Sequence, residues 1–207
     1  MELTNQQRNV VIIGGGPAGI EASKALDAHG YTVFLIEREN RLGGHLGRWD
    51  RLFPYGTPAD DVLGQMTASM GRVKWFTSTE VTQLNKLERG YNVILSNGLS
   101  VLADALLLTT GFTLFNASKK EEYGYGIYDK VITNADLEDY FSGIPVPAVG
   151  NPRRIGFVHC VGSRDEKVGN RYCSKVCCAT AVKQACEIKE KFPDAVVYCF
   201  YMDLRMF

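Results

Sequence analysis

A glycine-rich turn between two apolar runs near the N-terminus constrains the fold of this chain more than any other feature. Residues 10–13 are short, continuous and apolar, as expected of a buried parallel strand. They lead into residues 14–19 (GGGPAG), an amphipathic helical stretch to about Ala28, and a β-rich run at 32–36 that ends in Glu37. This order of strand, G-x-G-x-x-G turn, helix, strand and acid predicts a dinucleotide-binding βαβ unit.

Each residue of the turn has its own predicted role. Gly14 allows the tight turn, Gly16 lets the backbone approach a pyrophosphate, and Gly19 permits close packing of helix on strand. Pro17 and Ala18 open the helix, whose N-terminus would meet the phosphates. The acid that ends the second strand would accept hydrogen bonds from the adenosine ribose hydroxyls.

The run after the second strand indicates which dinucleotide is bound. Glu37 is followed by Arg38 and then by Gly43, Gly44 and His45. This Glu-Arg…Leu-Gly-Gly pattern resembles the two-dinucleotide-binding flavoproteins, the glutathione-reductase-like FAD enzymes. The resemblance implies that the paired glycines pass close to the pyrophosphate and ribityl part of FAD; a plain glycine loop is the alternative. His45 either approaches the flavin or lies in a solvent-exposed loop.

A β-rich region follows a helical stretch predicted at 60–70. The predicted strands are residues 73–76, 78–82, 91–95 and 99–102. Turn signals at Arg89-Gly90 and Asn97-Gly98 favour hairpins. A further apolar run ends in Thr109, Thr110 and Gly111, which resembles the strand end that passes the adenine half of FAD in the same flavoproteins. The candidate FAD-binding residues are Gly14, Gly16, Pro17, Ala18, Gly19, Glu37, Arg38, Gly43, Gly44, His45, Val81, Thr110 and Gly111.

The second informative feature is a group of four cysteines with the spacing C-x12-C-x3-C-C. Cys160 ends a strand-like run, and Cys177 and Cys178 fall in a helical stretch predicted for about 174–191, with Cys173 at or just before its start. On a helix, Cys173 and Cys177 lie one turn apart on one face, and Cys178 lies about 100° further round the axis. All four thiols can therefore converge.

Four thiolates around a helix N-terminus suit an iron–sulfur cluster, because the positive end of the helix dipole stabilises thiolates and offsets the charge of the cluster. We predict a [4Fe–4S] cluster held by Cys160, Cys173, Cys177 and Cys178. Buried core cysteines, a zinc site and a redox disulfide between the middle two remain open alternatives. Cys186 and Cys199 are expected in the core.

Length and motif order limit the domain organisation, because 207 residues leave room for one domain and part of a second. We predict an α/β fold: a Rossmann-like FAD-binding domain with a β-meander over residues 1–112, then a connecting segment and linker over 113–152. Residues 153–207 would form the start of a second β-α-β domain, which lacks the glycine fingerprint and carries the cysteines.

Composition restricts the partners. Lys plus Arg and Asp plus Glu both number 23, so net charge gives no reason to expect nucleic acid. We expect no membrane span, because no stretch of 18 apolar residues exists. Six cysteines without a signal-peptide pattern indicate a cytoplasmic protein with thiols or metal ligands.

Together the motifs resemble one family more closely. The FAD half, then residues 123–126 (YGYG), 160–167 (CVGSRDEK) and 172–178 (YCSKVCC), closely resembles the A subunit of heterodisulfide reductase and the related A subunit of quinone-modifying oxidoreductase. The resemblance implies a thioredoxin-reductase-like core with FAD, a [4Fe–4S] cluster on the four cysteines, and partner iron–sulfur subunits in a larger complex. It also implies an oxidoreductase that passes electrons from flavin to an iron–sulfur chain, with electron bifurcation at the flavin.

Two departures from the family pattern accompany this resemblance. The ferredoxin modules with C-x2-C-x2-C patterns are absent from the sequence, and the family core implies further strands after Phe207. We therefore expect a fragment, a split subunit completed by another chain, or a divergent chain, with a homodimer left open. The alternative functions are a pyridine-nucleotide–disulfide oxidoreductase and a non-enzymatic, cluster-bearing relay or docking subunit. No catalytic acid–base pair is readable.

Overall fold

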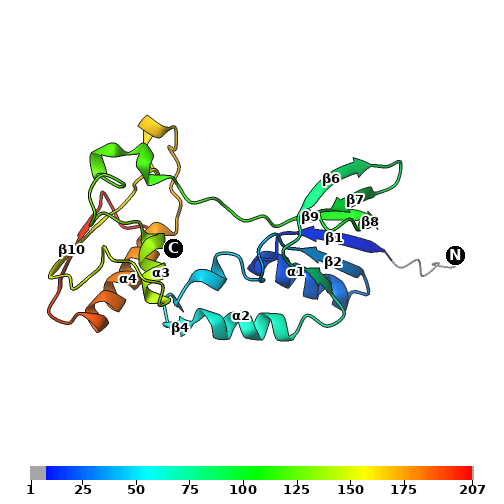
Figure 1. Ribbon diagram of the computed structural model, residues 1–207, viewed down its shortest axis with the longest axis horizontal. Coiled ribbons are helices and arrows are strands. Elements are labelled where there is room, and N and C mark those ends of the chain that lie inside the picture. Colours follow the sequence, from blue (N-terminus) through cyan, green and yellow to red (C-terminus); the bar gives the residue numbers. More distant parts are fainter. Residues whose placement is uncertain (1–7, 207) are drawn as a thin grey trace. The chain divides into compact units, whose positions relative to one another are not determined.

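The computed structural model describes residues 8–206 and divides them into two compact units (Figure 1). Unit 1 contains the described residues up to Gly47 together with Ala59–Phe112, and unit 2 contains Arg48–Pro58 and the described residues from Thr113 onward. Each unit has its own hydrophobic core. The short segment 48–58 therefore belongs to the same compact unit as residues that lie more than 50 positions later in the chain.

Unit 1 is a three-layer α/β structure with a parallel sheet in the middle (Figure 1). The sheet has the order β5-β2-β1-β9 and consists of Lys74–Phe76, Thr32–Ile36, Asn9–Ile13 and Ala105–Leu108. Helices α1 (Pro17–Ala28) and α2 (Ala59–Ala68) supply side chains to the core on one face. The second face packs against a meander of β6 (Val81–Lys86), β7 (Tyr91–Leu95) and β8 (Ser100–Ala103).

Strand β1 shows how the sequence builds these layers. Its side chains alternate between the two faces, so Ile12 joins the helix-side core while Val11 joins the meander-side core. Both are completely buried, which explains why the strand is apolar throughout and does not alternate with polar residues. The Rossmann-like fold class predicted from the sequence is confirmed.

The predicted hairpins are also present. Gly90 (φ 78°) and Gly98 (φ 84°) take left-handed conformations at the two turns of the meander. The first strand of the meander begins at Val81, three residues later than the predicted run. The residues before Val81 bind the segment that follows β2 instead: the N–H of Ser78 donates to the carbonyl of Glu39, and the N–H of Thr79 donates to the carbonyl of Glu37.

Unit 2 is a β-α-β structure with an additional helix. Strands β10 (Arg154–Val158) and β11 (Val196–Phe200) pair in parallel, and α4 (Cys177–Lys191) connects them. Helix α3 (Asn134–Phe141) packs beside α4, with Leu137, Phe157, Ala181, Ile188 and Ala195 as the buried core. The remaining elements of unit 2 are the hairpin β3–β4 (Arg51–Leu52, Thr57–Pro58) and the 3₁₀ turns η2 (Ala117–Lys119), η3 (Glu121–Tyr123) and η4 (Glu166–Val168). The 3₁₀ turn η1 (Leu46–Arg48) begins in unit 1 and ends in unit 2.

Three expectations for this region need correction. Helix α4 begins at Cys177 and not near Ser174, because Lys175 has a left-handed backbone (φ 64°) that no helix accommodates. Thr133 caps α3, in a capping box with Asp136. Cys186 and Cys199 are exposed and not part of the core. Residues 113–152, expected as a connection, contain α3 and contribute to the core of unit 2.

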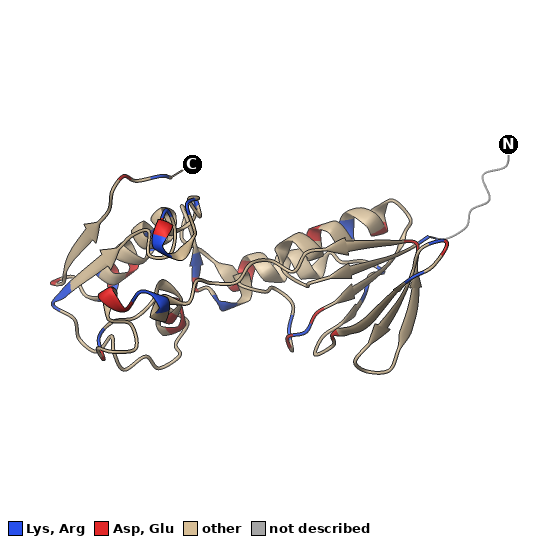
Figure 2. Cartoon of the chain, turned by 90° about the horizontal axis from the view of Figure 1, so that it is seen from above, with Lys and Arg blue, Asp and Glu red and all other residues tan. Residues whose placement is uncertain are grey.

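Charged side chains of both signs are interspersed along both units (Figure 2). Within residues 8–206, no helix combines the length and the apolar character that crossing a membrane requires.

A buried charged network joins α3 to α4. Lys183 Nζ lies 2.6 and 2.7 Å from the two carboxylate oxygens of Glu138, and Gln184 Nε2 donates to the same carboxylate at 2.7 Å. Glu187 lies beside this network, with Lys183 Nζ 3.6 Å away, but neither of its carboxylate oxygens has a hydrogen-bond partner. Burial is the main reason that the pKa of Glu187 is raised to about 7, with partial compensation by Lys183.

This raised pKa predicts a pH-dependent stability. The folded chain holds a proton on Glu187 more tightly than the unfolded chain, so the stabilisation is complete below pH 4.5 and is lost as pH rises through about 7. We expect the urea concentration at the midpoint of unfolding to decrease as the pH is raised from about 5 to about 8, roughly the span of the shift. In Glu187→Gln this decrease should be smaller. Equal pH profiles for the two proteins would contradict the assignment.

Candidate functional site

Three parallel strands of unit 1 end at the same edge of the sheet, and the residues predicted to bind a dinucleotide follow these ends. Gly14 follows β1 and donates its N–H to the carbonyl of Ile36 at 2.8 Å. Thr109 follows β9, and its Oγ1 donates to the carbonyl of Gly14 at 2.8 Å. The carboxyl edge of a parallel sheet is where dinucleotides bind in such folds.

The glycines of the turn differ in what surrounds them. A Cβ on Gly14 (φ 111°) would lie 2.3 Å from the carbonyl oxygen of Thr109, and a Cβ on Gly19 would lie 2.0 Å from the carbonyl oxygen of Gly14. The fold itself therefore requires glycine at these two positions. A Cβ on Gly16 would meet nothing within 4 Å, and this residue caps the N-terminus of α1 just before Pro17 and Ala18. The open space at a helix N-terminus fits a pyrophosphate.

Glu37 lies at the end of β2 and is only 6% exposed. Its Oε2 accepts from the N–H of Gly15 at 2.7 Å, and its Oε1 accepts from the N–H of Glu39 at 2.8 Å. These bonds fix the carboxylate beside the turn, and each oxygen keeps a further lone pair for a ribose hydroxyl. The side chain of Arg38 is exposed, and its Nε lies 3.6 Å from Glu39 Oε1.

The second glycine pair contacts the first turn directly. The N–H of Gly43 donates to the carbonyl of Gly15 at 2.8 Å, and a Cβ on Gly44 would lie 3.3 Å from Cα of Gly16. His45, predicted to approach a flavin or solvent, stacks on Phe112 with ring centroids 4.5 Å apart. Its Nε2 also lies 3.0 Å from the carbonyl oxygen of Phe112.

The remaining candidates frame this edge. Thr110 and Gly111 (φ 71°) continue from β9 beyond Thr109. Val81 begins β6 and packs in the core between sheet and meander. Phe112 was not predicted from the sequence, because its contact with His45 joins residues far apart in the chain. The geometry thus brings together all the strand ends that a dinucleotide site needs.

The four predicted cluster ligands occupy one neighbourhood in unit 2. Cys160 follows β10, Cys177 and Cys178 open α4, and Cys173 precedes the helix by four residues. All four are free thiols; Cys178 is buried and the other three are half-buried. Cys160 has a left-handed backbone (φ 60°), a conformation that is costly for an L-residue.

These thiols interact with one another. Burial raises the pKa of Cys160, and Cys177 adds to the increase, while the Arg164 guanidinium opposes it. Burial also raises the pKa of Cys178; the N–H of Arg205 opposes this increase, and the charges of Cys177 and Cys173 add to it. Thiols of this kind must lose their protons when a metal binds. Among residues 8–206, no group of three or more His, Cys, Asp and Glu side chains is placed to hold a metal ion.

Backbone N–H groups point at two of these sulfur atoms. The N–H of Lys175 lies 3.4 Å from Cys173 Sγ, and the N–H of Arg205 lies 3.5 Å from Cys178 Sγ. Arg164 contacts the Cys160 thiol and also pairs with Asp203. The segment after β11 thus reaches back to the cysteines, which the sequence did not reveal. By its chemistry, four sulfur atoms with N–H donors and a guanidinium nearby, the donor set suits an iron–sulfur cluster.

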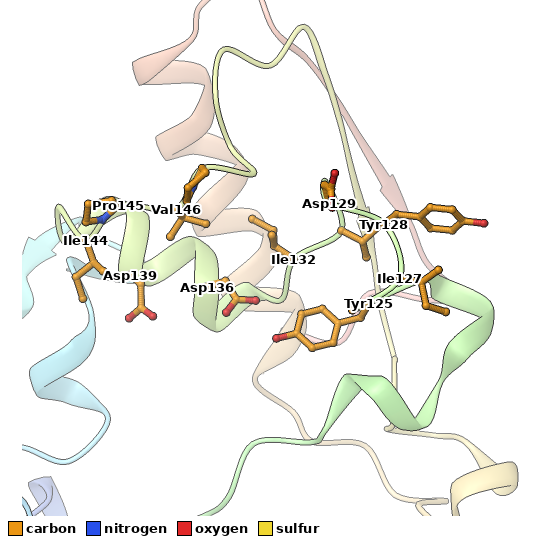
Figure 3. A pocket seen from close by; sticks show the side chains of 13 residues that line it. Tyr125, Ile127, Tyr128, Asp129, Ile132, Asp136, Asp139, Ile144, Pro145 and Val146 are labelled. Atoms are coloured by element: carbon orange, nitrogen blue, oxygen red, sulfur yellow. The ribbon is translucent and has the colours of Figure 1, made fainter.

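A separate hollow of about 560 Å³ lies in unit 2 between α3 and the segments on either side of it (Figure 3). Tyr125 and Tyr128 line it together with Asp129, Asp136 and Asp139. One of these carboxylates, Asp136, already accepts from the capping residue Thr133.

Comparison with known proteins identifies a matching domain family and similar solved structures. Residues 12–69 match the NAD(P)-binding Rossmann-like domain family. The crystal structure of L-proline dehydrogenase from P. horikoshii covers 94% of this chain and 36% of its own, with a TM-score of 0.53 and 19% sequence identity. This similarity supports the fold alone.

Curated relatives match nearly the whole chain. The A subunit of the H(2):CoB-CoM heterodisulfide,ferredoxin reductase of Methanothermobacter thermautotrophicus is 39% identical and covers 95% of the chain, and the iron-sulfur A subunit of the CoB–CoM heterodisulfide reductase of Methanocaldococcus jannaschii is 26% identical and covers 100%. The chain spans 44% and 45% of the length of these two relatives. The resemblance to heterodisulfide reductase A subunits that the sequence motifs indicated is thus confirmed by these relatives.

Proposed function

We propose that this chain is the FAD- and [4Fe–4S]-binding part of an oxidoreductase subunit that passes electrons from flavin to an iron–sulfur chain. The observation that carries the proposal is the gathering of four cysteines, spaced C-x12-C-x3-C-C, at a strand end and a helix N-terminus. The names of some curated relatives include the words "iron-sulfur subunit", which supports the proposal.

In unit 1 the proposal assigns the binding of FAD to the edge of the parallel sheet. The turn at Gly16 and the N-terminus of α1 would bind the pyrophosphate, and Glu37 would orient the ribose. Gly44 has a left-handed backbone (φ 53°), and a Cβ there would lie in tight contact, 3.3 Å from Cα of Gly16. The Gly43-Gly44 pair favours FAD over NAD as the bound dinucleotide.

In unit 2 the proposal assigns the cluster to Cys160, Cys173, Cys177 and Cys178. When bound, FAD exchanges two electrons and a [4Fe–4S] cluster exchanges one. The chain's own residues would set the reduction potential of the cluster. The N–H groups that point at Cys173 and Cys178, and the guanidinium of Arg164, favour the more negative, reduced state.

Partners and electron bifurcation are further parts of the proposal. We propose that other iron–sulfur subunits receive the electrons, in line with the subunit names of the relatives. Division of the two flavin electrons between different acceptors rests on the family resemblance.

The test is chemical analysis of the chain purified without oxygen. We expect about four irons, four sulfides and one FAD per polypeptide, with an electron paramagnetic resonance signal after reduction. Iron without flavin would favour a relay subunit, and flavin without iron would favour a disulfide oxidoreductase. Either result would contradict the proposal.

A further inference from the structure

One buried lysine outside the cysteine region is bound to the loop that joins Cys160 to Cys173. Lys120 lies between η2 and η3, and its side chain is only 5% exposed. Its Nζ lies 2.7 Å from Asp165 Oδ2, within the loop, and 2.7 Å from Glu122 Oε1, in its own segment. The hydrogen bond with Asp165 is the main reason that the pKa of Lys120 is raised, so the ammonium stays charged.

Asp165 occupies a central place in that loop. Its backbone exchanges two hydrogen bonds with Asn170, at 2.8 and 3.0 Å, and Asn170 Nδ2 donates to the carbonyl of Gly162 at 2.8 Å. The preceding N–H, that of Arg164, donates to the carbonyl of Tyr172 at 2.8 Å. The loop is therefore a small closed hairpin whose two ends lead directly to Cys160 and Cys173.

The loop also contains backbone conformations that need support. Cys160 (φ 60°) and Arg164 (φ 54°) are both left-handed without being glycine. Such conformations persist only where surrounding contacts hold them. Lys120 forms its ion pair with Asp165, the residue directly after Arg164. This ion pair can therefore stabilise the left-handed conformation of Arg164.

A second contact comes from the same side. Gly162 has φ 72°, and a Cβ there would lie 2.2 Å from the ring of Phe115. Phe115 and Lys120, which belong to one segment, therefore both contact the loop between Cys160 and Cys173. A buried ion pair differs from an exposed one in that removal of one partner leaves the other charge uncompensated. The neighbouring Lys119 is exposed, which makes it a matched control.

We infer that Lys120 is a positioning residue of the cysteine site: its ion pair with Asp165 holds the loop in the conformation that presents Cys160 and Cys173 to a shared cluster. The cluster part of this inference rests on the proposed function, whereas the restraint of the loop does not depend on it.

The test compares Lys120→Met with Lys119→Met in the full chain, purified without oxygen. We expect amide hydrogen exchange in residues 161–172 to accelerate by about tenfold or more in Lys120→Met and to stay unchanged in Lys119→Met. We also expect iron per polypeptide to fall by about half or more only in Lys120→Met, because a misplaced thiol no longer serves as a ligand. If Lys120→Met does not fold, Asp165→Asn replaces it, since this change removes the charge and keeps the shape.

The outcomes separate the inference from the proposed function. If the wild-type chain holds no iron, the proposed function fails, and hydrogen exchange alone decides whether Lys120 restrains the loop. If the wild-type chain holds iron, but Lys120→Met or its Asp165→Asn substitute keeps both the exchange rate and the iron content of the wild type, the inference is overturned. Equal effects of Lys119→Met and Lys120→Met would also overturn it.

Discussion

Replacing Cys177 with serine is expected to abolish the reduced-cluster signal and to lower the iron content from about four per polypeptide toward zero. Cys177 opens α4, and its thiol interacts with those of Cys160 and Cys178. Serine is nearly the same size, so the helix should still form. A hydroxyl, however, is a much poorer ligand than a thiolate for iron in such clusters.

The matched control for this prediction lies on the same helix. Cys186 is exposed and is not one of the four predicted cluster ligands. Cys186→Ser should therefore leave the iron content and the electron paramagnetic resonance spectrum unchanged. If the two serine variants behave alike, whether both keep or both lose the iron, the assignment of Cys177 as a ligand is wrong.

Replacing Gly16 with alanine is expected to weaken FAD binding by at least about tenfold, or 1.4 kcal/mol, without lowering the stability of the chain. Gly16 has φ −72°, which alanine adopts without strain, and a Cβ there would meet no protein atom within 4 Å. The methyl group would therefore occupy only the space reserved for the pyrophosphate. Binding is measured by the release of flavin fluorescence, and stability by urea unfolding.

Two other glycines serve as controls for that experiment. Gly64 in α2 also has open space around it, so Gly64→Ala should change neither FAD binding nor the fold. Gly14→Ala should disrupt the fold itself, because the new Cβ would lie 2.3 Å from the carbonyl oxygen of Thr109. Retention of normal FAD affinity by Gly16→Ala would place the pyrophosphate elsewhere.

The parts of the fold that follow local sequence rules were predictable. The apolar run of β1, the glycine turn and Glu37 define the βαβ unit because strand burial, helix entry and acid placement all act within one continuous segment. The hairpin turns at Gly90 and Gly98 were predictable for the same reason, since both need left-handed residues.

The parts that depend on distant contacts were not predictable. Nothing in residues 48–58 indicates that they pack with unit 2, where Arg51 pairs with Glu190 at 3.0 Å. Lys119 and Lys120 are adjacent and chemically identical, and only the folded chain shows that one is exposed and the other buried against Asp165. The start of α4 was placed too early because the left-handed Lys175 has no sequence signal.

The most direct test of the account is a crystal structure of the chain grown without oxygen, with an anomalous difference map recorded at the iron absorption edge. We expect a single group of iron peaks bonded to the sulfur atoms of Cys160, Cys173, Cys177 and Cys178, at the N-terminus of α4. A map without iron between these sulfur atoms, in which the thiols remain packed against carbon, would contradict the account and leave only a nucleotide-binding fold.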